Sequence, residues 1–211
     1  AAGMMSGCSV ILAVESFVAA SFAPVIVGFC LGCLLIYGIE KSLGDREDLS
    51  FGDLKGVNAA AGLVIFFSML VHSIGEGLSI GVSAMHTEHE GLNAVVLMSL
   101  AIHNIPEGMA VSMAFMSRGM SLRRAAFYAF VTNLPQPLTA LPAFLFMSRW
   151  ANMVPLGLGV ASGAIAYVVK NQLLPEALEH SKKSTVVQIA TIACILVIVS
   201  DAWSHFGGSH E

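Results

Sequence analysis

The sequence predicts an all-α membrane protein with about seven transmembrane helices, and two observations support this fold class. The first is composition: 56% of the 211 residues are hydrophobic, 11% are charged and the mean hydropathy is +0.78, too apolar for a soluble domain. The second is patterning, because short polar joints separate seven apolar runs, each long enough for the ~20 residues of helix that cross a bilayer. The runs, which form one domain over residues 1–211, lie near 4–21, 24–43, 56–85, 92–116, 121–148, 153–180 and 184–206.

The first two runs are predicted as plain membrane helices. The run near 4–21 has no basic stretch before it and no small-residue cleavage pattern, so we do not interpret it as a signal peptide. The run near 24–43 ends at the longest polar joint, residues 40–55, whose clustered charges predict a solvated loop. The composition is the same on both sides of this loop, which is therefore not a domain boundary.

The third and fourth runs carry two copies of one polar motif. The copies are His72-Ser73-Ile74-Gly75-Glu76-Gly77 and His103-Asn104-Ile105-Pro106-Glu107-Gly108. In each copy a histidine and a glutamate four residues apart share one face of a helix. Pro106 cannot donate a helical hydrogen bond, and Gly75 weakens the other helix at the same place. Two such motifs on adjacent membrane helices predict a pseudo-symmetric pair that faces one common point.

The ligand types in the two motifs favour a metal site. Imidazole nitrogen and carboxylate oxygen suit Zn²⁺, Fe²⁺, Mn²⁺ and Cd²⁺, whereas Ca²⁺ and Mg²⁺ prefer oxygen ligands throughout. With Glu76 and Glu107 ionised and both histidines neutral, one bound dication brings the site to zero charge. One histidine and glutamate pair alone would be explained equally well by a structural hydrogen bond, so the duplication carries this prediction.

The fifth and sixth runs each contain polar residues beside proline. The fifth helix is predicted to break at the stretch Thr132-Asn133-Leu134-Pro135-Gln136-Pro137. Gln136 is interpreted there either as a weak amide ligand or as a residue whose amide is satisfied within the kink. The stretch Asn171-Gln172-Leu173-Leu174-Pro175-Glu176 lies near the end of the sixth run, and Glu176 is interpreted either as a release-side ligand or as an interfacial residue. The seventh run is a further apolar helix.

Charge and composition also indicate orientation and partners. Positive loop residues gather on one side of the predicted helices, which puts the N-terminus in the cytoplasm and the C-terminus outside or in a lumen. The lipid bilayer is thus one partner, and the absence of a basic stripe excludes nucleic acid.

Small residues such as Gly28 and Gly163 allow close helix packing, within the chain or in a homodimer. Four cysteines in apolar runs are expected to be packing residues: Cys8, Cys30, Cys33 and Cys194.

On these motifs the chain resembles the ZIP (Zrt-, Irt-like protein) family of divalent metal transporters, and within it the GufA-like branch. The string HNIPEG at residues 103–108 is highly specific, and the resemblance covers essentially the whole chain. It implies a metal site in the membrane, often binuclear. The resemblance places His72, Glu76, His103, Glu107 and Gln136 around the first metal, and Ser73 and Asn104, with the two glutamates bridging, around the second.

Several positions depart from the family pattern. Gln136 stands where the branch usually has glutamate, Ser73 where asparagine is usual, and Asn104 where aspartate is common. These changes weaken the second metal position, so we expect one well-held ion. Gln172 likewise replaces a frequent acidic residue on the exit side. The family has eight helices, and the seven runs here imply that its first helix is missing, through truncation or an incomplete gene model.

The sequence therefore predicts a transporter, and not an enzyme, that moves Zn²⁺ or a similar ion toward the cytoplasm. It has no ATP-binding motif, which excludes a primary pump. Two alternatives remain open from the sequence. One is a seven-helix intramembrane zinc hydrolase, although the histidine pattern of such enzymes is absent. The other is a truncated relic that binds metal without transporting it.

Overall fold

The computed structural model describes residues 22–44, 46–83, 104–105, 107–146, 153–189, 191–192 and 195. Residues 107–116 and 183–189 are helical. The predicted run near 4–21, His103 and most of the run near 184–206 lie outside the described residues. The named elements in chain order are α2 (Phe22–Leu43), β1 (Ser50–Phe51), β2 (Leu54–Lys55), α3 (Gly56–Ser83), α5 (Leu122–Asn133), α6 (Pro135–Leu145), α8 (Val154–Val168), the π-helix η2 (Val169–Leu173) and α9 (Leu174–His180).

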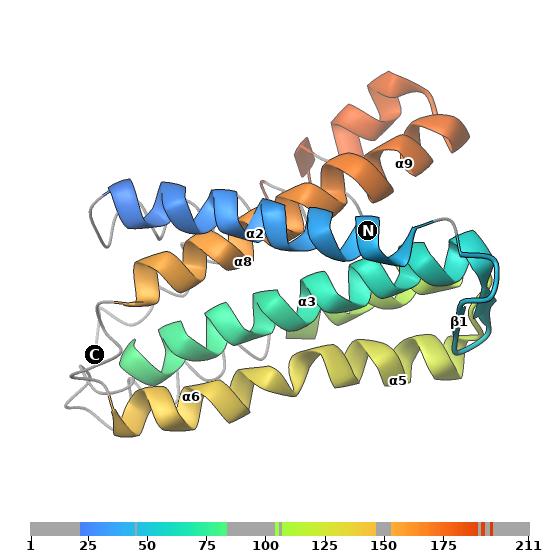
Figure 1. Cartoon of the computed structure of the whole chain (residues 1–211). Coiled ribbons are helices and arrows are strands. Elements are labelled where there is room, and N and C mark those ends of the chain that lie inside the picture. The colour runs from blue at the N-terminus through green and yellow to red at the C-terminus, as the bar shows by residue number, and fades with distance from the viewer. Residues whose placement is uncertain are drawn as a thin grey trace.

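Helix α3 lies in the middle of the described helices (Figure 1). It packs against α8 on one side and against α6 on the other, while α2 covers α8. The main core joins Ile65 and Met69 of α3 to Val111 and Phe115 of the helical residues 107–116. The helix that carries the first polar motif is therefore surrounded by the others, which positions its side chains for a buried site.

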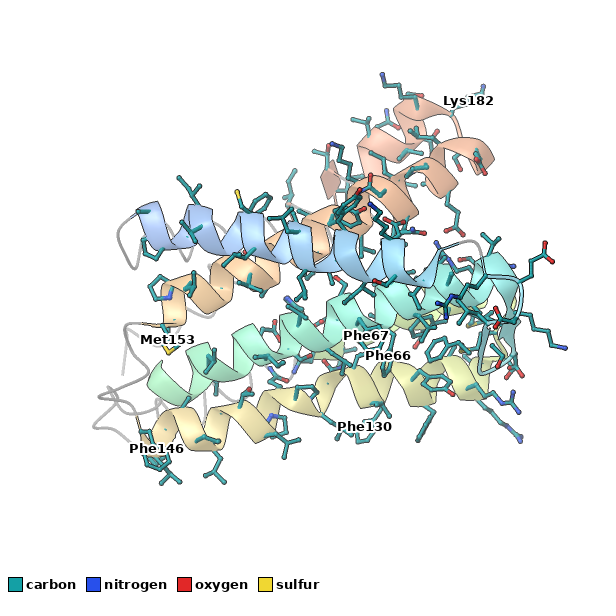
Figure 2. All side chains as sticks on the ribbon, in the orientation of Figure 1. Phe66, Phe67, Phe130, Phe146, Met153 and Lys182 are labelled. Carbon is teal, nitrogen blue, oxygen red and sulfur yellow. The ribbon has the colours of Figure 1, made fainter. Side chains whose placement is uncertain are left out.

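The outer surface of these helices is apolar, as expected in lipid. Phe130 and Phe146 project from the outer side of α5 and the end of α6 (Figure 2) and are 65% and 55% exposed. Among the described residues, three helices are long and apolar enough to cross a membrane: Ala23–Leu43, Gly56–Leu78 and Val154–Glu179. Exposed apolar surface on this scale marks a membrane protein. The all-α membrane class predicted from composition is thereby confirmed.

Glycines let α2 and α8 touch along their backbones. A Cβ on Gly32 would lie 2.1 Å from the carbonyl oxygen of Val160, and one on Gly163 would lie 2.1 Å from the carbonyl oxygen of Phe29. No side chain fits in either gap, so only glycine permits this close approach. These small residues are thus used for packing within the chain.

The loop after α2 folds into a small docked hairpin. Ser50 pairs with Lys55 and Phe51 with Leu54, across a turn in which Gly52 has a φ of +60°. Leu54 is buried, and the ring of Phe51 contacts the rings of three aromatic residues, Phe66, Phe115 and Tyr128. The sequence predicted a solvated loop here, and the difference arises from these two apolar side chains.

Candidate metal centre

Three buried side chains meet between α3 and the helical residues 107–116. His72 and Glu76 lie one turn apart on α3, and Glu107 approaches them from the neighbouring helix. The Nε2 atom of His72 is 3.0 Å from Oε1 of Glu76 and 3.3 Å from Oε1 of Glu107. One ligand atom from each residue lies within 4.8 Å of the other two. This spacing allows all three to bind a single ion.

This cluster is hidden from solvent, and two of its residues, His72 and Glu107, lack hydrogen bonds among the described residues. His72 is fully buried and Glu107 is only 2% exposed. Among the described residues, both ring nitrogens of His72 and both carboxylate oxygens of Glu107 have no hydrogen bond of good geometry. Buried polar atoms without partners cost free energy, and a cation between them would satisfy several at once. One imidazole and two carboxylates form a ligand set that suits zinc and similar ions.

Two amides extend the cluster on the side of α6. The Nδ2 atom of Asn104 donates to Oε1 of Gln136 at 2.8 Å, and Nε2 of Gln136 donates to Oε2 of Glu76 at 3.3 Å. Gln136 is itself buried. Glu76 is therefore held from two directions, by His72 at one carboxylate oxygen and by Gln136 at the other.

Gln136 reaches Glu76 because the fifth apolar run breaks in two. Helix α5 ends at Asn133 and α6 begins at Pro135, so Gln136 lies in the first turn of α6. Proline is favoured there because its missing N–H would have no helical partner in any case. Helix α6 then packs on α3 at Gly77, where a Cβ would lie 2.3 Å from the carbonyl oxygen of Gln136. This close contact needs glycine, and it places the glutamine beside the carboxylate.

Ser73 contacts backbone beside the site. Its hydroxyl donates to the carbonyl oxygen of Thr132 at 2.6 Å and lies 3.5 Å from Oδ1 of Asn133. Ser73 is fully buried. In this structure the serine therefore connects α3 to the end of α5, where the chain breaks.

The predicted site residues are thus found in three situations. His103 lies outside the described residues. Ser73 adjoins the cluster through its contact with α5. The others form one connected group through close polar contacts and hydrogen bonds: His72, Glu76, Glu107, Gln136 and Asn104.

One buried polar residue near the site was missed by sequence reasoning. Ser68 is fully buried, and its hydroxyl has no hydrogen bond among the described residues. It precedes His72 by four residues, so it shares the face of α3 that carries the motif. The four-residue spacing could have indicated that Ser68 lies near the site. Serines are common in apolar runs, however, so the residue type alone does not single it out.

The polar residues at the end of the sixth run are engaged with other helices. Glu176 pairs with Arg118 at 2.8 Å. Gln172, in the π-helix η2, donates to Oε1 of Glu40 at 2.6 Å, and the hydroxyl of Tyr167 donates to the same carboxylate. Glu40 thus supplies an acidic group beside the glutamine, a pairing that the sequence alone did not reveal.

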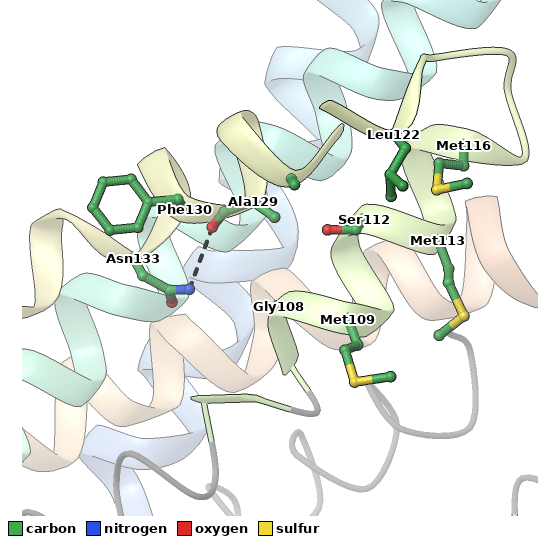
Figure 3. Close-up of a pocket in the computed structure, with 10 residues that line it drawn as sticks. Gly108, Met109, Ser112, Met113, Met116, Leu122, Ala129, Phe130 and Asn133 are labelled. Carbon is green, nitrogen blue, oxygen red and sulfur yellow. Dashed lines mark hydrogen bonds between the residues drawn. The ribbon is translucent and has the colours of Figure 1, made fainter. Parts of the chain in front are cut away.

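A groove of about 400 Å³ runs between the helical residues 107–116 and α5 (Figure 3). It begins at Gly108, next to Glu107, and its walls include the side chains of Met109, Met113 and Phe130. Asn133 lies at one side, where its amide donates to the carbonyl oxygen of Ala129 at 3.3 Å. The groove is almost wholly apolar, so it offers no ligand set comparable to the cluster around His72.

These helices, their apolar outer surface and the buried histidine and glutamates define an integral membrane protein with metal-binding side-chain types in its interior. The chain belongs to the ZIP zinc transporter family, whose sequence model matches residues 40–197. The family resemblance of the two motifs is thereby confirmed. The family is one of transporters, so the hydrolase alternative is not supported.

Two relatives illustrate this membership. A protein of Arabidopsis thaliana named as a zinc transporter is 36% identical over 193 residues, which are 92% of this chain and 31% of the relative. The zinc transporter GufA of Myxococcus xanthus is 36% identical over 121 residues, or 57% of this chain and 47% of that protein. The chain therefore spans about a third and about half of the lengths of these two relatives.

Proposed function

We propose that this chain carries Zn²⁺ or a similar divalent ion across a membrane, toward the cytoplasm, through a mid-membrane site formed by His72, Glu76 and Glu107. The observation that supports this most directly is the cluster of three buried ligand atoms within 4.8 Å of one another. Family membership and the zinc transporters among the relatives agree with it. His103 and Gln136 are the further residues that the resemblance adds to the site.

The chemistry of the site favours a single dication. Two carboxylates and a neutral imidazole carry two negative charges, which one Zn²⁺, Fe²⁺, Mn²⁺ or Cd²⁺ balances. A neutral complex is the form that a low-dielectric interior tolerates best. Imidazole as a ligand selects against Ca²⁺ and Mg²⁺, which prefer oxygen throughout.

The distribution of cations supports the orientation on which the proposed direction rests. Of the ten Lys and Arg residues, three lie in residues 41–55, three in residues 118–124 and two at 182–183. At one end of the bundle, ion pairs join Arg124 to Asp53 and Arg118 to Glu176 of α9. Positive loops face the cytoplasm in most membrane proteins. Glu176 lies at that end, where a departing ion would pass it.

Zinc uptake into proteoliposomes that contain the full chain tests this function. We expect Glu76→Ala and Glu107→Ala each to reduce the uptake rate at least by the roughly 10- to 100-fold that loss of even an outer partner costs a metal site. Glu47→Ala is the matched control, because Glu47 is an exposed glutamate of the loop after α2. Uptake that survives both site substitutions in correctly inserted protein would refute the proposal.

The same assay separates transport from mere binding. A protein that only binds metal would retain zinc in the wild-type chain but show no time-dependent flux into the vesicles. A transporter shows both, and the two substitutions remove them together. Competition by Mn²⁺, Cd²⁺ and Mg²⁺ in the same vesicles ranks the ions, with Mg²⁺ expected to be the weakest competitor.

A further inference from the structure

Glu76 uses its two carboxylate oxygens for different partners. Oε1 lies against Nε2 of His72, on the side where Glu107 also approaches, while Oε2 accepts the amide hydrogen of Gln136. In the common two-oxygen bridging mode, a carboxylate offers one oxygen to each of two metal ions. Here Oε2 already accepts a hydrogen bond from a neutral donor, so an N–H group of Gln136 takes the place that a second ion would need in this mode.

The orientation of the Gln136 amide is fixed from both ends. Ionised Glu76 can only accept hydrogen bonds, so it requires the NH₂ group of Gln136 on its side. Asn104 then donates Nδ2 to the remaining oxygen of Gln136 at 2.8 Å. If the glutamine amide turned over, its oxygen would face the Glu76 carboxylate and its NH₂ group would face that of Asn104. Both contacts would be repulsive, so the oxygen of Gln136 stays turned toward Asn104.

We infer that the chain Asn104 to Gln136 to Glu76 restricts this site to one metal ion, with Gln136 and Asn104 as positioning residues rather than ligands. This inference rests on the proposed function of the His72 site. Charge supports it, because a second dication would leave two uncompensated positive charges beside neutral amides in the membrane interior. The two amides thus determine the number of ions that the site holds.

Metal stoichiometry of the purified full chain, loaded with Zn²⁺ and freed of excess ion, tests the inference. The wild-type chain should hold about one ion. Gln136→Glu replaces the N–H donor with a third carboxylate, and we expect it to hold about two ions. Gln188→Glu is the matched control, since it makes the same chemical change on an exposed helical position outside the site, and it should stay at one.

A second variant, Asn104→Asp, tests the same inference in case Gln136→Glu does not fold. Asn104→Asp places a carboxylate against Oε1 of Gln136, which forces that amide to turn its NH₂ group away from Glu76. Because that NH₂ group no longer binds Oε2 of Glu76, the two carboxylates at positions 76 and 104 should then admit a second ion. Loading with Mn²⁺ gives an independent readout, because two neighbouring Mn²⁺ ions produce an exchange-coupled electron paramagnetic resonance signal and an isolated one does not.

The positioning role has its own test. Gln136→Met removes the hydrogen bond without adding charge, and Asn104→Leu removes the group that orients the glutamine. Each should lower zinc affinity by about 10- to 100-fold, as loss of an outer partner does at other metal sites. The double variant should be no weaker than Gln136→Met alone, because both residues act through Glu76. Near-normal affinity in Asn104→Leu would show that Asn104 does not position Gln136 and would overturn this assignment.

The outcomes distinguish the inference from the function on which it rests. Two zinc ions in the wild-type chain, or one ion in both carboxylate variants when they are folded, would overturn the inference and leave a metal transporter in place. No zinc in a folded wild-type chain would overturn both. One ion in the wild-type chain and two in either carboxylate variant would establish the restriction.

Discussion

At the residue scale, a substitution of Ser73 tests whether its hydroxyl binds metal or only stabilises the contact between α3 and α5. The hydroxyl is buried and donates to the carbonyl oxygen of Thr132 at 2.6 Å. We expect Ser73→Ala to lower the free energy of unfolding by about 1 kcal/mol, the net value of a typical buried hydrogen bond. The zinc content should not change, because the hydroxyl is turned toward α5. Thermal unfolding in detergent and elemental analysis measure the two effects.

Ser42→Ala is the control for this substitution. Ser42 is exposed, and its hydroxyl donates to the carbonyl oxygen of Gly38 within the same helix. Its loss should leave both stability and zinc content close to the wild-type values. Loss of bound zinc in Ser73→Ala alone would show that the serine is a ligand after all.

At this scale the sequence predicts residue types better than orientations. The four-residue spacing of His72 and Glu76 is sufficient to predict that both side chains share a helix face, and the structure places them 3.0 Å apart. The turn of the Gln136 amide toward Asn104 has no such signal. It depends on the break at Leu134 and on the close contact at Gly77, both of which involve packing between helices far apart in the chain.

At the scale of elements, the hairpin after α2 is attached to the start of α5 by one carboxylate. Asp53 accepts hydrogen bonds from the backbone N–H of Ser121 at 3.0 Å and from its hydroxyl at 2.6 Å, and it pairs with Arg124. These donors surround the N-terminus of a helix, where a negative charge is stabilising. The hydrogen bonds from Ser121, with the charge of Arg124, lower the pKa of the Asp53 carboxyl below its ordinary value.

This lowered pKa predicts how stability depends on pH. The folded state favours ionised Asp53, so the contribution is complete above the ordinary pKa of 3.8 and is lost as the pH falls through the lower folded value. We therefore expect Asp53→Asn to melt at a lower temperature than the wild-type chain at pH 7. The difference should shrink below about pH 4. Thermal unfolding in detergent across this range measures it.

Asp48→Asn is the control for the loop. Asp48 is exposed in the same segment and has no hydrogen bond or ion pair with any described residue. Its substitution should not change the melting temperature at either end of the pH range. A constant difference between Asp53→Asn and the wild-type chain at all pH values would contradict the role of the ionised carboxylate.

The sequence predicts the break between α5 and α6 but not the hairpin, and each outcome has a physical reason. The prolines at 135 and 137 predict a break, because neither can donate a helical hydrogen bond, and the chain divides there into α5 and α6. The hairpin was not predicted. Its strands contain two residues each, too few to show alternation, and Phe51 is buried only because α3 and α5 meet around it.

At the scale of the whole molecule, composition is sufficient to predict an all-α membrane protein but not which helices contact one another. The apolar runs predict membrane helices, since little else accommodates so many hydrophobic residues. Which helices touch depends on small residues whose partners the sequence does not name. Gly28 and Gly32 could have contacted another copy, and the structure instead places both against α8.

The orientation of the whole molecule in the membrane can be tested by cysteine labelling. The exposed residue Asp48 lies just before strand β1, and Phe146 lies beyond α6, at the end of the bundle opposite β1 (Figures 1 and 2). Because the cationic loops share the end that carries Asp48, that end should face the cytoplasm. In a chain whose native cysteines are replaced by serine, Asp48→Cys should react with an impermeant maleimide only after the cells are opened. Phe146→Cys should react in intact cells, and the reverse pattern would refute the proposed orientation of the chain.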